Sequence, residues 1–232
     1  MGPSLERLHL IFDADDTLWE ANILFERAID DFITWIAHPT LDPVSIRATL
    51  HDIEAANSVA HGYGTRVFLR SLHECFEHLL ERPPTLEDQA RIEALAAPLL
   101  AHEIEPIDDV EETLVALGKR HDLLLLTKGD EHEQQSKILV SGLGDHFRRI
   151  VIVPEKTTEV YVRLVETEHL DPARTWMIGN SPKSDIGPAL AAGLGAVFIP
   201  NVNTWAMEHD VVDESAERLL QIDRFADLLA HF

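Results

Sequence analysis

The chain has 232 residues, of which 45% are hydrophobic, so it is long enough to bury one core and to carry an inserted domain. Its 19 Lys and Arg stand against 41 Asp and Glu, and the resulting net charge of −22 repels nucleic acid and anionic membranes, which we exclude as partners. A single cysteine, Cys75, excludes an internal disulfide framework, and the N-terminus has no signal-peptide pattern, so we expect a cytoplasmic protein.

Residues 8–12 form an apolar run that predicts a buried strand, and Asp13, Asp15 and Thr17 follow it directly. A parallel strand would carry these side chains to the C-terminal edge of its sheet, where ligands bind. Because Asp13 and Asp15 are two residues apart, their carboxylates would face one locus and repel each other unless a cation or a shared proton intervenes. The spacing indicates a metal ion, although Asp-x-Asp is also common in turns and helix caps.

Residues 19–105 show helical periodicity, with helices expected at 21–35, 41–60, 66–80 and 86–102. Four helices in tandem predict an inserted bundle. Between the second and third helices, Tyr63 and Arg66 are candidates for reading a ring or a second anionic group of a substrate. The alternative is a helix connection in which the aromatic ring packs and the arginine is solvated.

From residue 107 onward the pattern alternates. Helices are expected at 109–120, 131–142, 157–168 and 182–192, strands at 122–126, 150–153, 175–178 and 196–199, and short helices close the chain. Such alternation predicts right-handed βαβ units and a parallel sheet that is covered on both faces. The predicted fold is therefore a doubly wound, Rossmann-like α/β core of residues 1–18 and 106–232 with an inserted all-helical cap domain of residues 19–105.

Further polar residues follow the later strands of the predicted sheet. Thr127, Lys128 and Gly129 follow one strand, Lys156 the next, and Asn180 the third, with Asp185 five residues on. Taken singly, these residues are explained by a helix cap, a solvated lysine and a turn. Their common place at the ends of neighbouring parallel strands favours one shared site.

These residues resemble the motifs of haloacid dehalogenase-superfamily hydrolases with a helical C1-type cap. The stretch from Asp13 to Thr17 is similar to the family's first motif, Thr127 to its second, Lys156 to its third, and Asn180 through Asp185 to its fourth. Two positions depart from the usual pattern: Lys128-Gly129 stands where Asn-Gly is common, and Asn180 stands where an Asp is common. The amide of Asn180 can still coordinate through its oxygen, but it neutralises one charge fewer.

The resemblance implies a Mg²⁺-dependent phosphatase that hydrolyses a small phosphorylated metabolite through an aspartyl-phosphate. Asp13 would be the nucleophile and a metal ligand, and Asp15 the general acid and base, with its backbone carbonyl on the metal. Thr127 and Lys156 would contact the phosphoryl group. The remaining members of the expected site are Thr17, Lys128, Gly129, Tyr63 and Arg66 for the substrate, and Asn180 or Asp185 for the metal.

Two alternatives stay open beside a phosphatase. A 2-haloacid dehalogenase would release halide, which leaves without a proton, and dehalogenases of this superfamily generally lack a second Asp at the position of Asp15. A binding protein of the same fold with little turnover is favoured by Asn180 alone. Phosphotransfer to a hydroxyl, the identity of the substrate and the oligomeric state also remain undecided by the sequence.

Overall fold

The computed structural model describes residues 7–212 and 215–232, and the chain divides into two compact units. The first, here called the α/β unit, comprises Met1–Asn22 and Ile104–Phe232, and the second, the helical unit, comprises Ile23–Glu103. The sequence-based boundaries, 19 and 105, lie a few residues outside those of the helical unit. Each unit buries a hydrophobic core of its own.

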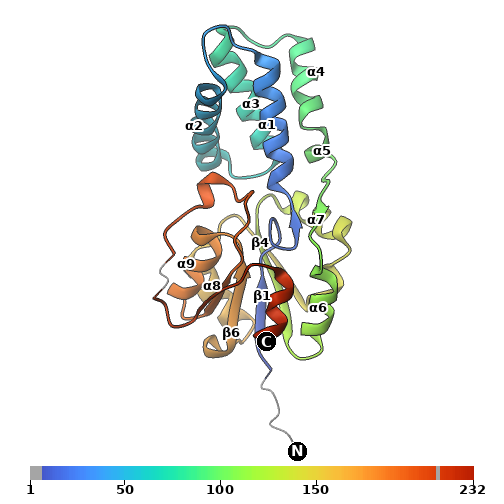
Figure 1. Cartoon of the computed structure of the whole chain (residues 1–232), viewed down its shortest axis with the longest axis vertical. Helices are drawn as coiled ribbons and strands as arrows, with labels where there is room; N and C mark the ends of the chain where they lie inside the picture. The colour runs from blue at the N-terminus through green and yellow to red at the C-terminus, as the bar shows by residue number, and fades with distance from the viewer. Residues whose placement is uncertain (1–6, 213–214) are drawn as a thin grey trace, which may run out of the picture. The chain divides into compact units, whose positions relative to one another are not determined.

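The α/β unit is built on a parallel sheet, which has six strands within the described residues, in the order β5-β4-β1-β6-β7-β8 (Figure 1). The strands are β1 His9–Phe12, β4 Asp122–Lys128, β5 Arg149–Val153, β6 Thr175–Gly179, β7 Gly195–Phe198 and β8 Leu219–Gln221. Ile11 of β1 pairs with Leu124 on one side and Met177 on the other. From β1 the strands β4 and β5 follow on one side, and β6, β7 and β8 follow on the other, which confirms the doubly wound, Rossmann-like prediction. The direction in which strands are added therefore reverses between β1 and β6.

Both faces of the sheet are buried. Successive side chains of its central strand point to opposite sides, so they enter two different cores. Leu10 and Phe12 of β1 enter one core, which also contains Leu114 of α6 (Val110–Gly118). Ile11 enters the other core together with Tyr161 of α8 (Thr158–Thr167). Helices α7 (Glu131–Ser141) and α9 (Gly187–Ala191) complete the layers.

The segment predicted to be all-helical is bounded by a pair of short strands. β2 (Trp19–Glu20) pairs antiparallel with β3 (Glu105–Pro106), so the prediction that the segment 19–105 is all-helical is wrong at its two ends. Two-residue strands are too short to show an alternating pattern. Trp19 is 1% exposed and packs in the core of the α/β unit, which fixes the chain where it leaves the sheet.

The helical unit contains α1 (Asn22–Ile36), α2 (Pro43–His61), α3 (Thr65–Leu80), α4 (Leu86–Leu95) and α5 (Ala97–Leu100). The helix expected at 86–102 is therefore split at Ala96. Pro98 lies in the first turn of α5, where its missing N–H is tolerated, whereas in the middle of one long helix it would have removed a hydrogen bond. In the described ranges, no helix is both long and apolar enough to cross a membrane.

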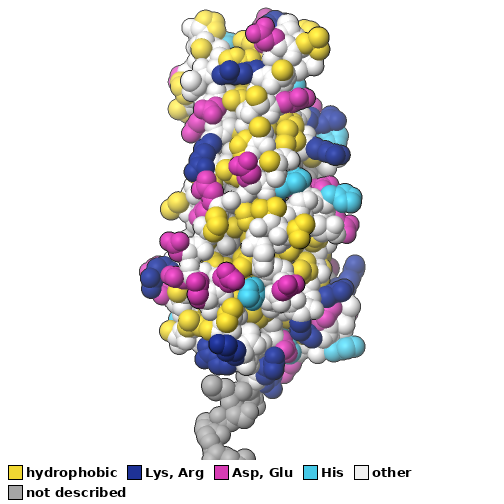
Figure 2. All heavy atoms as spheres, turned by 90° about the vertical axis from the view of Figure 1, so that its right-hand side faces the viewer, with side chains coloured by type: hydrophobic (Ala, Val, Ile, Leu, Met, Phe, Trp, Pro, Cys, Tyr) yellow, Lys and Arg dark blue, Asp and Glu magenta, His cyan; other side chains and the backbone are white. Residues whose placement is uncertain are grey.

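The C-terminal part also departs from the expectation. The helix expected at 182–192 begins with a π-helical turn, Pro182–Ile186, before α9, and the chain end contains strand β8 as well as the 3₁₀ turns Ala206–Glu208 and Phe225–Ala230. β8 pairs with β7 at the sheet edge. A three-residue edge strand has no periodicity that separates it from a loop. On the face shown in Figure 2, acidic, basic and apolar side chains are interspersed over both units.

Candidate active site

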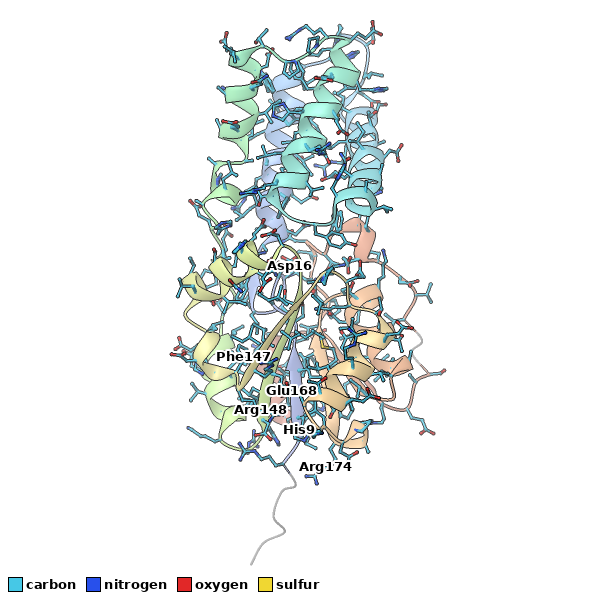
Figure 3. All side chains as sticks on the ribbon, turned by 180° about the vertical axis from the view of Figure 1, so that it is seen from behind. His9, Asp16, Phe147, Arg148, Glu168 and Arg174 are labelled. Carbon is cyan, nitrogen blue, oxygen red and sulfur yellow. The ribbon has the colours of Figure 1, made fainter. Side chains whose placement is uncertain are left out.

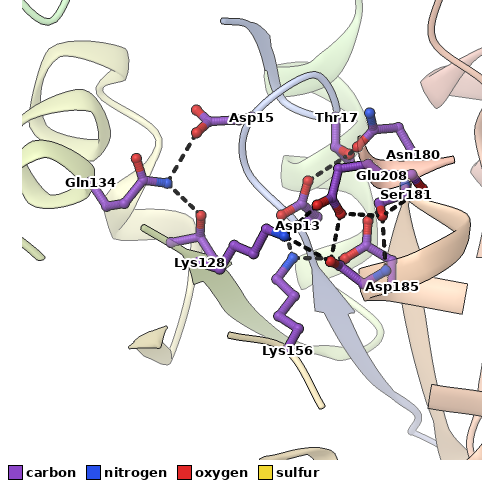
Figure 4. Close-up of polar contacts among 12 residues, drawn as sticks. Asp13, Asp15, Thr17, Lys128, Gln134, Lys156, Asn180, Ser181, Asp185 and Glu208 are labelled. Carbon is purple, nitrogen blue, oxygen red and sulfur yellow. Dashed lines mark hydrogen bonds and ion pairs between the residues drawn. The ribbon is translucent and has the colours of Figure 1, made fainter. Parts of the chain in front are cut away.

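The predicted site residues of the α/β unit lie at the C-terminal ends of its central strands. Figure 3 shows Asp16, which follows β1, at the edge of the sheet opposite to His9, where that strand begins. Figure 4 shows the polar side chains that meet at this C-terminal edge. They come from four strand ends: Asp13, Asp15 and Thr17 after β1, Thr127, Lys128 and Gly129 at the end of β4, Lys156 after β5, and Asn180 and Asp185 after β6.

Lys156 joins two of the predicted carboxylates. Its Nζ contacts Asp13 Oδ1 and lies 2.7 Å from Asp185 Oδ1. Lys156, Asp13 and Asp185 are 3%, 7% and 0% exposed, so this is a buried ion cluster. Burial, reinforced by the charge of Asp185, raises the pKa of Asp13 to about 7 against the opposing effect of Lys156. Burial alone would lower the pKa of Lys156, but the two carboxylates raise it, so the lysine stays charged.

Both oxygens of Asp185 are engaged, because its Oδ2 accepts a hydrogen bond of 3.0 Å from the Ser181 backbone N–H. Gly179 makes room for this arrangement, since a Cβ atom there would lie 2.2 Å from Asp185 Oδ2. Asp185 therefore anchors Lys156 to the turn after β6. The prediction that Asp185 is a metal ligand stays a prediction.

Asn180 faces Asp13 across a hydroxyl group. Thr17 Oγ1 lies 3.1 Å from Asp13 Oδ2 and 3.3 Å from Asn180 Oδ1. The amide is oriented from its other side, because Asn180 Nδ2 donates to Thr204 Oγ1 at 2.8 Å. Thr204 follows β7 in a loop, and nothing in the local sequence pointed to it. Its hydrogen bond turns the amide oxygen, and not the nitrogen, toward Asp13.

This donor set fits Mg²⁺, which prefers oxygen ligands. Asp13 Oδ2 and Asn180 Oδ1 both lie within hydrogen-bond distance of the Thr17 hydroxyl, so the two oxygens are near neighbours. Among the described residues, no three His, Cys, Asp or Glu side chains form a group that could hold a metal ion. The amide oxygen of Asn180 would take the place of one carboxylate, so a Mg²⁺ site here would be formed by Asp13 and Asn180 together.

Asp15 has a separate set of partners. Its Oδ1 accepts a hydrogen bond of 2.7 Å from Trp19 Nε1–H, and its Oδ2 accepts from Gln134 Nε2 at 3.1 Å and from Lys137 Nζ at 2.5 Å. Burial alone would raise the pKa of Asp15, but the charge of Lys137 and these hydrogen bonds lower it. The sequence reasoning missed Gln134 and Lys137, and their only signal was a polar pair spaced i, i+3 on a helix that follows a motif.

The second motif is also held by neighbours that the sequence did not reveal. Gln134 Nε2 lies 2.5 Å from Thr127 Oγ1, which links Thr127 to Asp15. Lys128 Nζ contacts the Glu208 carboxylate and lies 3.0 Å from Ser184 Oγ.

Glu208 is 7% exposed and accepts hydrogen bonds from the hydroxyls of Ser181, at 2.6 Å, and Ser184, at 2.5 Å. Burial alone would raise the pKa of Glu208, but Lys128 and these hydroxyls lower it. The Gly129 N–H donates to the Val153 carbonyl at 3.0 Å. Lys128 and Gly129 thus have structural partners in this arrangement, and their predicted contacts with substrate stay predictions.

Tyr63 and Arg66 lie in the helical unit. Tyr63 is half-buried in the connection between α2 and α3, and Arg66 is exposed in the first turn of α3. Gly62 and Gly64 flank the tyrosine with φ of 82° and 119°, a conformation that favours glycine. Recognition of substrate by this connection stays a prediction.

A family model described as haloacid dehalogenase-like hydrolase matches residues 9–193. The chain belongs to this family. Among solved structures, a haloacid dehalogenase-like family hydrolase from Xanthomonas campestris is 31% identical with a TM-score of 0.84, covering 97% of this chain and 94% of that one.

Two more distant matches carry the names of different reactions. A curated phosphoserine phosphatase from Thermus thermophilus is 26% identical over 189 residues, which are 77% of this chain and 72% of the relative. L-2-haloacid dehalogenase from Xanthobacter autotrophicus shares the fold at 16% identity, with a TM-score of 0.64 over 96% of this chain and 97% of that one. Membership of the family makes the chain a hydrolase, and the geometry of its site has to distinguish between these chemistries.

Proposed function

We propose that this haloacid dehalogenase-like hydrolase is a Mg²⁺-dependent phosphatase that hydrolyses a small phosphorylated metabolite through an aspartyl-phosphate. The observation that carries the proposal is the second carboxylate, Asp15, which is held beside Asp13 by partners of its own. A displacement that expels an alkoxide needs a group to protonate it, whereas one that expels halide does not. Asp13 alone would serve either reaction.

The proposed reaction has two steps. In the first, an Asp13 oxygen attacks phosphorus, the bond from phosphorus to the ester oxygen breaks, and the departing alkoxide takes a proton from Asp15. In the second, Asp15 removes a proton from water, which attacks the phosphorus and releases inorganic phosphate and Asp13. The lowered pKa of Asp15 keeps its carboxyl group ionised, as a general base must be in the second step. The negative charge of an arriving phosphate raises this pKa, which favours the protonated form that the first step requires.

Cations near Asp13 let it approach an anionic substrate. Lys156 is charged and in contact with the Asp13 carboxylate, and together with the Thr127 hydroxyl it would bind phosphoryl oxygens. Asp13, Asn180 and the backbone carbonyl of Asp15 would hold Mg²⁺. When bound, this ion neutralises the charge that builds up on the transferred group.

We extend the proposal to the helical unit, which would act as the cap that the family resemblance implies, with Tyr63 and Arg66 in substrate recognition. The phosphoserine phosphatase relative makes phosphoserine the first ester to test. Nucleic acid and membranes are not among the proposed partners, because the chain carries a net charge of −22. A cytoplasmic location fits its single cysteine.

The test is a phosphate-release screen of the purified chain with phosphoserine, phosphoglycolate, sugar phosphates, nucleotides and flavin mononucleotide, in Mg²⁺ and in EDTA. We expect turnover that requires Mg²⁺ and falls by about 10⁴-fold or more in Asp13→Asn. Asp122→Asn is the matched control, since Asp122 pairs with Arg7 at the opposite edge of the sheet.

Two results would refute the proposal. One is a wild-type chain that releases halide from 2-chloropropionate without metal and releases no phosphate. The other is an Asp13→Asn variant that keeps wild-type turnover.

A further inference from the structure

We infer that Gln134 and Lys137 of α7 are positioning residues, which hold the Asp15 carboxyl group where it transfers a proton to the leaving alcohol. The inference rests on the proposed phosphatase function. It concerns residues outside the four motifs, and it makes α7 part of the machinery for leaving-group protonation.

Lys137 is buried in a place where a lysine is unstable without a partner. It is 6% exposed, although it lies on a helix whose neighbouring Leu139 and Val140 are 81% and 60% exposed. A buried ammonium group is stable when it is paired with a carboxylate, and Lys137 Nζ lies 2.5 Å from Asp15 Oδ2. The helix therefore uses an inward-facing position for a contact to Asp15 where an apolar residue would have packed as well.

Gln134 ties the Asp15 carboxylate to the second motif. Its Nε2 lies 3.1 Å from Asp15 Oδ2 and 2.5 Å from Thr127 Oγ1, so the two hydrogens of one amide have one acceptor each. Gln134 is 2% exposed, which protects both contacts from competition by solvent. The proton-transfer group and a hydroxyl proposed to bind phosphate are thereby held in a fixed relation.

Gly129 provides the space for this bridge. Its φ is 142°, and a Cβ atom built on it would lie 3.2 Å from Gln134 Cγ and 3.3 Å from Gln134 Cδ. A side chain at this position would press on Gln134, which would have to shift away from it. The glycine of the second motif therefore has a role through Gln134 that requires no contact with substrate.

Three donors on one carboxylate fix its position more tightly than one. Trp19 holds Oδ1, while Gln134 and Lys137 hold Oδ2, so loss of one donor from α7 leaves Asp15 tethered but free to rotate about the remaining bonds. A misplacement of about 1 Å in a reacting group can cost about 10²-fold in rate. The effect of losing Lys137 should therefore fall on the step in which Asp15 acts.

The experiment compares two esters that differ in their need for a proton. The p-nitrophenolate of p-nitrophenyl phosphate leaves without help, whereas the alkoxide of an alkyl phosphate, such as phosphoserine or the best metabolite of the screen, needs protonation. The quantity is kcat/KM, which reports all steps through departure of the leaving group. Lys137→Met keeps the length of the side chain and removes its charge, and Gln135→Met on the exposed face of the same helix is the matched control.

We expect Lys137→Met to lower kcat/KM by about 10- to 100-fold for the alkyl ester and by less than about threefold for the aryl ester. Gln134→Met removes a neutral group and leaves the ion pair between Lys137 and Asp15 in place. It should show the same selectivity, so the inference can still be tested if Lys137→Met does not fold. In an Asp15→Asn background, Lys137→Met should cause little further loss with the alkyl ester, because the group that it positions is gone.

Three results would overturn the inference. Equal losses on both esters would make Lys137 and Gln134 purely structural, and unchanged kcat/KM on both would remove them from the mechanism; in each case the wild-type activity would leave the phosphatase proposal intact. A wild-type chain without turnover of any ester would remove the proposed function and this inference together.

Discussion

Asp13 and Asp15 lie on one short loop, but their surroundings shift the pKa values of the two carboxyl groups in opposite directions. Asp13 shares Lys156 with a second buried anion, Asp185, and its pKa rises. Asp15 is paired with Lys137, for which the described residues show no second carboxylate, and accepts from neutral donors as well, and its pKa falls. Burial acts on both in the same sense, so the difference comes from the number of cations and anions that other elements bring to each. The motif thus supplies the carboxylates, while the later strands and α7 decide their charge.

Removal of the lysine on the Asp13 side should have the largest effect on stability. Lys156→Met leaves Asp13 and Asp185 buried without their cation, and we expect a loss of about 3–5 kcal/mol in the free energy of unfolding at pH 7 to 8, measured with urea. At pH 5 the loss should shrink, because one carboxyl group can then take up a proton.

The exposed Lys119 provides the control, and Lys119→Met should change stability by less than about 0.5 kcal/mol. A loss for Lys156→Met as small as that of the control would mean that the two carboxylates do not depend on the lysine. The difference between Asp13 and Asp15 would then need another cause.

Addition of a carboxylate close to Asp13 should raise the affinity for Mg²⁺ by about one order of magnitude. Asn180→Asp supplies a charged oxygen where the amide oxygen faces Asp13, and we expect the Kd for Mg²⁺ to fall about tenfold in a calorimetric titration. The same change should lower stability without metal, because a third anion joins Asp13 and Asp185. Gln135→Glu on the exposed face of α7 is the control, and an equal gain in both variants would point to general electrostatics instead of coordination.

A half-buried carboxyl group of the other unit, Glu54 of α2, tests the effect of burial away from the two lysines. Burial, reinforced by the charge of Glu26 and opposed by Arg47, raises the pKa of Glu54 to about 7. The folded chain therefore binds this proton more tightly than the unfolded chain, so the contribution of Glu54 to stability is present below pH 4.5 and is lost as the pH rises through 7.

The amide side chain introduced by Glu54→Gln does not ionise. Relative to wild type it should gain about 1 kcal/mol between about pH 4.5 and pH 8 in urea denaturation, since the half-buried site weakens the full effect. Glu93→Gln, at an exposed position of α4, is the control variant. A difference between wild type and Glu54→Gln that does not change with pH would show that burial alone does not shift a carboxyl group in this chain.

The parts of the site that follow strands could be predicted from the sequence. Apolar runs mark the buried strands, and parallel pairing brings their C-terminal ends together, so the sequence alone predicts that Asp13, Lys156 and Asp185 lie close to one another. Their contacts follow from the topology, while their proposed roles await the experiments above.

Gln134, Lys137, Thr204 and Glu208 could not be found in that way. The face that α7 turns toward the sheet depends on how the helix packs, and Thr204 and Glu208 lie in an irregular segment between β7 and β8 that has no repeating pattern. The short strands β2, β3 and β8 were missed for a related reason, because two or three residues contain no period to detect. A local sequence pattern therefore does not predict contacts between segments that are distant in the chain.

The central position of β1 has a consequence for how the chain reaches its native state. His9 pairs with Asp122 on one side and with Thr175 on the other, so both neighbours of the first strand are made long after it. Contacts so distant in sequence slow folding, because the loop between them must close before the pairing contributes. The antiparallel contact of β2 with β3 shortens this search, since it brings the two ends of the helical insertion together. We therefore expect the helical unit to form early during synthesis and the sheet to assemble slowly, only once most of the chain has left the ribosome.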